Sequence, residues 1–153
     1  METFTLALRP ATEADRVPMF HVLEAAMRHY VEQTWGPWDT AWQWKYFREH
    51  FNCAICQIVT VDSHAAGYFQ VVREADHFFI EFIILSPEYH HRGIGASLIR
   101  DLLAEATRAK LPVGLQVLKV SPARRLYERL GFVMIGETDT HFLMEARPGG
   151  SLS

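Results

Sequence analysis

Short apolar runs and helically spaced apolar residues alternate along the chain, and their order predicts the elements of the fold. Runs rich in Val, Ile and Phe indicate strands, and apolar residues three or four positions apart indicate amphipathic helices. The expected strands are 4–8, 54–61, 66–73, 78–85, 112–118, 132–135 and a last one within 136–145, and the expected helices are 12–31, 40–51, 93–109 and 121–130. This order predicts an α/β domain, a mixed sheet flanked by helices.

Cap and turn residues support several of these boundaries. Thr12 can cap the first helix. The polar segment 62–65 predicts a hairpin turn between the second and third strands. Ser121 as N-cap and Pro122 as first helical residue predict the start of the last helix, and Gly131 predicts its end.

One carboxylate, Glu81, interrupts the otherwise apolar strand 78–85. Alternation places it on one face of the strand with Ile83 and Leu85. Burying a carboxylate costs free energy unless it is paired or solvated at a cleft. Two explanations remain open. Glu81 forms a salt bridge with an arginine of a neighbouring strand, or it is a general base at the mouth of a cleft, since partial burial makes a carboxylate a better proton acceptor.

Two glycines, Gly93 and Gly95, stand at the turn between a predicted strand and a predicted helix, with Arg92 beside them. The first backbone N–H groups of a helix lack internal partners and carry the positive end of its dipole, so a helix start lined with glycine can admit a phosphate. Leu98 stands where a dinucleotide fingerprint needs a third Gly, and no Gly-Lys-Ser/Thr follows as in a P-loop. The remaining alternatives are another type of phosphate turn and a helix start tightened by two glycines.

This turn resembles the acetyl-CoA signature of the GNAT superfamily of N-acetyltransferases, Gln/Arg-x-x-Gly-x-Gly/Ala, with His90 first, Gly93 fourth and Gly95 sixth. A second segment, 121–132, resembles the family's later Asn-x-x-Ala-x-x-Leu-Tyr-Glu-Lys-Leu-Gly-Phe element. With the opening residues 8–15, the segments lie in the family's order and span nearly the whole chain. The resemblance implies the GNAT acyl-CoA N-acyltransferase fold: a mixed, mostly antiparallel central sheet of about six or seven strands flanked by about four helices.

Two residues depart from the family pattern. His90 stands where Gln or Arg is usual; it can donate a hydrogen bond to a phosphate but carries a full charge only part of the time near neutral pH. Ser121 stands near a position where Asn is common, and its side chain has a shorter reach toward the pantetheine arm. These departures favour the alternative to an enzyme, a non-catalytic acyl-CoA-binding or regulatory module.

The resemblance implies that acetyl-CoA is the acyl donor and assigns the residues that hold it. Backbone groups around 83–85 would pair with the pantetheine arm as an added strand does, and an N–H near Leu85 would polarise the thioester carbonyl. The implied cofactor-binding residues are Ile83, Ile84, Leu85, His90, His91, Arg92, Gly93, Ile94, Gly95, Ala96, Ser97, Ser121, Arg124 and Tyr127.

Tyr127 and Glu81 are the implied catalytic residues. The phenol of Tyr127 would hydrogen-bond the cofactor sulfur and supply a proton, or stabilisation, to the leaving thiolate; the structural alternative is a tyrosine packed with Leu130 and Ala123. Glu81 would accept a proton from the amine. The reaction would be direct transfer of acetyl to a primary amine in a ternary complex, with a small-molecule amine as acceptor or, as the second choice, a protein or peptide amine.

Aromatic residues are dense between 35 and 47. Most of these rings should pack between the first two helices and the sheet. Trp35 and Trp38 fall in a predicted loop, 33–40, and because loops lie at the surface we expect these two rings to contact substrate. In the resembling family this region forms a wall of the acceptor site. His141, on the last strand, is a further candidate for the acceptor pocket, with a structural role as its alternative.

Composition and charge exclude several kinds of partner. A net charge of -3 and a pI near 6.2 leave no basic footprint for nucleic acid. No apolar run reaches the roughly 18 residues of a membrane span, and the N-terminus lacks a signal-peptide pattern. We therefore expect no nucleic acid, no membrane and a cytoplasmic protein.

Cysteine and histidine spacing predicts no metal. Cys53 and Cys56 form an isolated Cys-x-x-Cys in a predicted strand, which favours buried thiols over a redox or zinc site. The eight histidines show no ligand spacing. We expect one domain over 1–147 with a flexible tail at 148–153, and a homodimer is possible.

Overall fold

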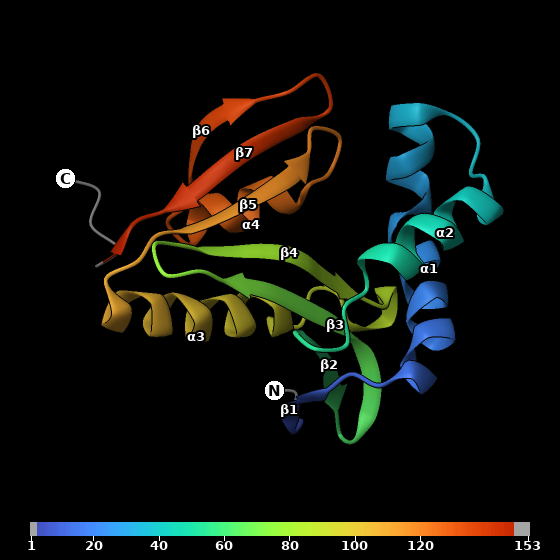
Figure 1. Ribbon diagram of the computed structural model, residues 1–153, viewed down its shortest axis with the longest axis horizontal. Coiled ribbons are helices and arrows are strands. Elements are labelled where there is room, and N and C mark those ends of the chain that lie inside the picture. Colours follow the sequence, from blue (N-terminus) through green and yellow to red (C-terminus); the bar gives the residue numbers. More distant parts are fainter. Residues whose placement is uncertain (1–2, 149–153) are drawn as a thin grey trace. The chain divides into compact units, whose positions relative to one another are not determined.

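The computed structural model describes residues 3–148, so residues 149–153 of the expected tail lie outside the described part (Figure 1). The strands are β1 (Leu6–Pro10), β2 (Cys56–Val61), β3 (His64–Arg73), β4 (Phe78–Leu85), β5 (Val113–Leu118), β6 (Val133–Glu137) and β7 (His141–Ala146). The helices are α1 (Arg16–Trp35), α2 (Thr40–His50), α3 (Ile94–Ala109) and α4 (Ala123–Arg129), and two 3₁₀ turns are η1 (Glu13–Asp15) and η2 (Pro87–Tyr89).

The strands form one mixed sheet in the order β1-β2-β3-β4-β5-β7-β6. β4 and β5 pair in parallel, whereas the pairs β1–β2, β2–β3, β5–β7 and β6–β7 are antiparallel. Within residues 3–148 the sheet has seven strands, accompanied by four α-helices. The expected mixed sheet with about four helices is therefore confirmed.

The chain divides into two compact units. The first comprises Met1–Gln70 and Phe82–Ile94, and the second comprises Val71–Glu81 and Gly95–Ser153. The first unit therefore holds α1, α2, β1, β2, most of β3 and the end of β4. The second unit holds the start of β4, most of α3, α4 and the last three strands.

Several of the predicted strand boundaries differ from the observed ones. β1, expected at 4–8, pairs with β2 over Leu6–Pro10, and Pro10 is tolerated because β1 is an edge strand. The hairpin turn between β2 and β3 is shorter than expected and holds only Asp62 and Ser63, with φ of +50° and +69°. A two-residue turn with both residues at positive φ matches the twist of hairpin strands.

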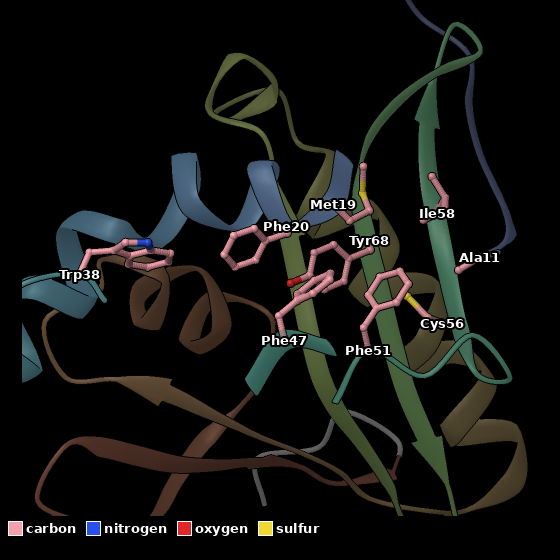
Figure 2. Close-up of a cluster of buried hydrophobic side chains, with 9 residues drawn as sticks. All are labelled: Ala11, Met19, Phe20, Trp38, Phe47, Phe51, Cys56, Ile58 and Tyr68. Atoms are coloured by element: carbon pink, nitrogen blue, oxygen red, sulfur yellow. The ribbon is translucent and has the colours of Figure 1, made fainter. Parts of the chain in front are cut away.

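A buried cluster rich in aromatic rings, the aromatic cluster, forms the core of the first unit (Figure 2). Its members are Ala11, Met19, Phe20, Trp38, Phe47, Phe51, Cys56, Ile58 and Tyr68. The ring of Phe20, on α1, lies 5.2 Å from the ring of Trp44 and 5.6 Å from that of Phe47, both on α2. Tyr68, on β3, meets Phe47 edge-on at 5.9 Å. Rings packed edge-on or tilted contribute stability beyond the area they bury, so these contacts hold α1 and α2 against β3.

The two loop tryptophans of the sequence prediction do not behave alike. Trp35 is the last residue of α1, because the helix continues beyond its predicted end and stops only at Gly36, which has φ +96°. The Trp35 side chain is 59% exposed. Trp38 is in the short loop, but the prediction that it lies at the surface is wrong, since it is only 8% exposed. Its backbone N–H donates to Glu32 at 3.2 Å, and its ring lies 6.4 Å from that of Phe20.

The two cysteines differ in burial. Cys56 is 2% exposed, and burial raises the pKa of its thiol to about 12, which keeps it protonated and unreactive. Cys53 is partly exposed. Among residues 3–148, no three His, Cys, Asp or Glu side chains group in a way that could hold a metal ion. No helix in the same range is long and apolar enough to cross a lipid bilayer.

In the second unit, α3 buries the apolar stripe that the sequence predicts. Leu98, Ile99, Leu102 and Ala106 are at most 4% exposed. Glu105, on the same helix, accepts two hydrogen bonds from the guanidinium of Arg73 on β3, at 2.7 and 2.9 Å.

The C-terminus of α3 uses a turn that glycine usually supplies. Lys110 has φ +60°; its N–H donates to Thr107, and the N–H of Leu111 donates to Ala106, the two bonds of a Schellman motif. A side chain in this left-handed conformation costs roughly 1 kcal/mol.

We therefore expect Lys110→Gly to raise the free energy of unfolding by roughly 1 kcal/mol. Urea denaturation followed by circular dichroism measures the change. The matched variant Ala109→Gly, one residue earlier and still helical, should lower the free energy instead. An equal loss in both variants would contradict the assignment of Lys110 to the motif.

Candidate functional site

The end of β4 departs from regular pairing. The ladder between β4 and β5 covers Phe78–Ile80, and β4 continues to Leu85 beyond it. On the β3 side, a Cβ placed on Gly67 would lie 2.0 Å from the carbonyl oxygen of Ile84. That oxygen occupies the space where every other residue type carries its side chain. The backbones of β3 and β4 therefore approach unusually closely at this point.

A tight turn connects β4 to α3. Ser86-Pro87 ends the strand, and η2 follows, with the N–H of Tyr89 donating to Ser86 and that of His90 donating to Pro87. The Ser86 hydroxyl donates to the Glu88 carboxylate at 2.9 Å. The turn folds the chain back so that His90 meets the end of the strand, where its Nε2 lies 2.8 Å from the Leu85 carbonyl oxygen.

The residues just before α3 leave open space at the helix start. Gly93 has φ +78°, and a Cβ there would meet no protein atom within 4 Å. His91 also has a positive φ, +62°, and the Arg92 guanidinium lies over the Tyr89 ring at 5.6 Å. A bare backbone at the N-terminus of a 16-residue helix suits an anion such as a phosphate.

The other residues that the sequence assigns to donor binding differ in how far they are buried. Ile94 and Ala96 are buried, so only their backbone groups can face a ligand. Gly95 and Ser97 are partly exposed, whereas His90 and His91 are exposed. Ile83, Ile84 and Leu85 are partly exposed, and Ile84 packs against the aromatic cluster of the first unit.

Tyr127 lies on α4, in the second unit. It is 8% exposed, and its ring packs against Phe132 at 6.0 Å. Burial raises the pKa of its phenol to about 12, since the charged phenolate is poorly solvated there. The hydroxyl group is therefore protonated over the whole physiological pH range.

Ser121 and Arg124 flank the start of α4. The sequence predicts Ser121 as the N-cap, but Pro122 occupies the cap position and α4 starts at Ala123. The Ser121 hydroxyl still accepts a hydrogen bond from the N–H of Ala123 at 3.2 Å. The Arg124 guanidinium lies over the Phe142 ring, 4.4 Å from the ring centroid. Its Nε donates a hydrogen bond to the Glu128 carboxylate at 3.4 Å, so both contacts orient the side chain.

The two remaining candidates differ in exposure. Glu81 is exposed, so the partial burial on which the sequence argument for a general base rested is not present. His141 is partly buried, its Nδ1 lies 2.8 Å from the Thr140 hydroxyl, and burial lowers the pKa of its ring. His141 is therefore largely neutral at physiological pH.

The predicted site residues divide between the two units. Leu85, His90 and Gly93 belong to one continuous turn in the first unit, which also carries Trp35 and Trp38. Glu81, Ser121, Arg124, Tyr127 and His141 belong to the second unit. Sequence reasoning missed Gly67, for which the only signal was a glycine inside a predicted strand.

Comparison with known proteins gives a consistent result. A model of the acetyltransferase (GNAT) family matches residues 20–132. No curated protein matches the chain significantly. Among solved structures, the PaiA N-acetyltransferase from Thermoplasma acidophilum, in complex with coenzyme A, has a TM-score of 0.73 at 17% identity, covering 94% of this chain and 99% of that one.

Two further structures are similar over the same length. The ribosomal-protein-S18-alanine N-acetyltransferase from Escherichia coli has a TM-score of 0.69 at 19% identity, covering 94% of each chain. An acetyltransferase from Thermus thermophilus has a TM-score of 0.74 at 14% identity, covering 96% of this chain and 99% of that one. At such identities these likenesses establish the fold, and it is the fold that the sequence predicts.

Proposed function

The chain belongs to the acetyltransferase (GNAT) family of acyltransferases, and from this premise we propose that it transfers acetyl from acetyl-CoA to a primary amine. The observation that carries the proposal is the turn before α3. Gly93 holds a positive φ with open space beside it, directly ahead of the helix start. Such a turn suits a pyrophosphate, the anionic group of coenzyme A.

In this proposal the donor binds along two adjoining segments. The backbone N–H groups of Gly93, Gly95 and Ala96 hold the pyrophosphate, and residues 83–85 pair with the pantetheine arm as an added strand does. The irregular end of β4 supports this assignment, since β4 runs on to Leu85 after its ladder with β5 ends at Ile80. Ser121 and Arg124 bind the donor from the start of α4.

The proposed reaction is a direct displacement. The amine nitrogen attacks the thioester carbonyl carbon, the carbon–sulfur bond breaks, and the amine loses a proton while the thiolate of coenzyme A leaves. The exposed carboxylate of Glu81, which solvent can reach, accepts that proton directly or through water. The N–H of Leu85 stabilises the developing oxyanion.

Tyr127 serves the leaving thiolate in this proposal. A phenol with a pKa of about 12 does not readily give up its proton to a thiolate. Tyr127 therefore acts mainly as a hydrogen-bond donor, which stabilises the sulfur as negative charge develops on it.

The proposed acceptor is a small-molecule amine, with a protein or peptide amine as the second candidate. The Escherichia coli neighbour, whose name specifies a ribosomal-protein alanine, is the reason to retain the second. In the first unit, the exposed ring of Trp35 is the proposed acceptor contact. Trp38, which is buried, can act only by supporting the loop before α2.

Calorimetric titration with acetyl-CoA and with free CoA tests the proposal, followed by thiol release with a panel of small and peptide amines. We expect both acetyl-CoA and free CoA to bind, and we expect free thiol to be released with one class of amine. Gly93→Glu, with its folding checked by circular dichroism, should lose binding, because the substitution places a negative charge beside the proposed pyrophosphate site. Binding without release from any amine would favour the non-catalytic module, and no binding would refute the donor assignment.

A further inference from the structure

We propose that His90 is a positioning residue, which fixes the orientation of Leu85 so that its backbone N–H is held ready for the thioester carbonyl. The inference rests on the proposed function, in which Leu85 supplies the oxyanion contact. It gives His90 a different role from the phosphate ligand that the family resemblance implies. All the residues concerned lie in the first unit.

The hydrogen bond between His90 and Leu85 defines the state of the ring. Nε2 lies 2.8 Å from the Leu85 carbonyl oxygen. A carbonyl oxygen can only accept, so Nε2 carries the hydrogen, and in the neutral ring Nδ1 is then an acceptor. A neutral His90 in this arrangement therefore has no ring N–H left to donate to a phosphate.

The peptide between Leu85 and Ser86 is held at both ends. Its carbonyl accepts from His90, and its N–H donates to the Ala66 carbonyl on β3 at 2.8 Å. These two hydrogen bonds leave from opposite edges of the same planar peptide group, so together they fix how the plane is rotated about the strand axis. His90 supplies the side-chain contact of this pair.

The preceding peptide is oriented by β3. The Ile84 carbonyl oxygen lies where a Cβ of Gly67 would be, and this peptide is trans. In a trans peptide the N–H points opposite to the carbonyl, so the N–H of Leu85 points away from Gly67. With both flanking peptides fixed, the backbone angles of Leu85 are fixed too, and a pre-oriented N–H is what oxyanion stabilisation requires.

The local sequence explains why residue 90 can reach Leu85. Pro87 starts the 3₁₀ turn, and the bonds from Tyr89 to Ser86 and from His90 to Pro87 close it. The turn thereby returns the chain to the end of β4 by residue 90. A longer or looser loop would not hold the imidazole beside the Leu85 carbonyl.

Two variants at this position separate positioning from phosphate binding. His90→Leu removes the donor and should lower kcat about tenfold, with the dissociation constant of CoA unchanged by calorimetry. His90→Gln should restore most of kcat, because its amide nitrogen reaches about as far from Cα as Nε2 and can donate to the same carbonyl. A loss of CoA affinity in His90→Leu with kcat retained would overturn the proposal, and so would failure of His90→Gln to restore kcat.

A second measurement does not depend on activity. Nitrogen-15 NMR of the ligand-free protein should show His90 as the tautomer with hydrogen on Nε2, and the opposite tautomer would overturn the proposal. If the wild-type protein neither bound CoA nor released thiol, the proposed function would fail by itself. The tautomer would then still report whether His90 donates its hydrogen bond to the Leu85 carbonyl oxygen.

Discussion

Replacing Tyr127 by phenylalanine should lower kcat about 100-fold while the dissociation constant of CoA stays nearly unchanged. The reason is that, in the proposed mechanism, the phenol contributes only when charge develops on the leaving sulfur. The ring packs against Phe132, and phenylalanine preserves that packing, so folding and donor binding should be spared. Steady-state kinetics and calorimetry on the same preparation measure the two effects.

Tyr46→Phe is the matched control for this substitution. Tyr46 is 43% exposed on α2 and stacks on Trp42, so loss of its hydroxyl should leave kcat unchanged. Equal losses of turnover and of CoA affinity in Tyr127→Phe would contradict its role toward the thiolate.

The pKa of Tyr127 also predicts a pH dependence. Because burial raises the pKa to about 12, the phenol should keep its proton, and the ratio of wild-type to Tyr127→Phe rates should stay constant up to about pH 11. The same raised pKa also determines how the free energy of unfolding depends on pH. The unfolded phenol ionises near 10, so the stability linked to this group is complete below about pH 10 and is lost as the pH rises toward 12.

Replacing Gly67 by alanine should lower the free energy of unfolding by about 3 kcal/mol or more. The added Cβ would lie 2.0 Å from the Ile84 carbonyl oxygen and 2.9 Å from the Leu85 Cα. Both are backbone atoms, so no side-chain rotation can relieve the overlap, and β3 and β4 must separate. Any molecule that still folds should also lose turnover, because Leu85 moves with the strand.

Gly136→Ala provides the comparison for Gly67→Ala. Gly136 lies on β6, and its added Cβ would lie 3.5 Å from the Leu143 side chain, an ordinary contact. We expect little change there, or a slight gain, because alanine restricts the unfolded chain. Urea denaturation of both variants decides the matter, and equal effects would show that the close approach of β3 and β4 carries no particular cost.

The elements of the fold were predictable because their signals are local. The apolar stripe of α3 and the short run of β4 each reveal an element within about a dozen residues. The glycine turn before α3 was also predictable, since its signal is a glycine at a strand-to-helix junction and Gly93 adopts a positive φ. Phosphate binding at this turn stays a prediction.

Burial and orientation could not be derived in the same way, because they depend on partners distant in sequence. Trp38 is buried because Phe20, on another helix, receives its ring. Glu81 is exposed although its neighbours in β4 are apolar. The close approach at Gly67 depends on Ile84, which belongs to the next strand. His90 matches a motif position, but only the fold shows that its ring is directed to Leu85.

The clustering of tryptophan determines what an optical probe of this protein can report. All four tryptophans, at 35, 38, 42 and 44, fall within one short segment of the first unit. Intrinsic fluorescence therefore follows the environment around α1 and α2, with emission from exposed Trp35 and Trp42 mixed with that of buried Trp38. A change confined to the second unit, such as Lys110→Gly, is therefore followed by circular dichroism, which reports on the backbone. Gly67→Ala displaces a strand of the first unit, so we expect it to shift the tryptophan emission.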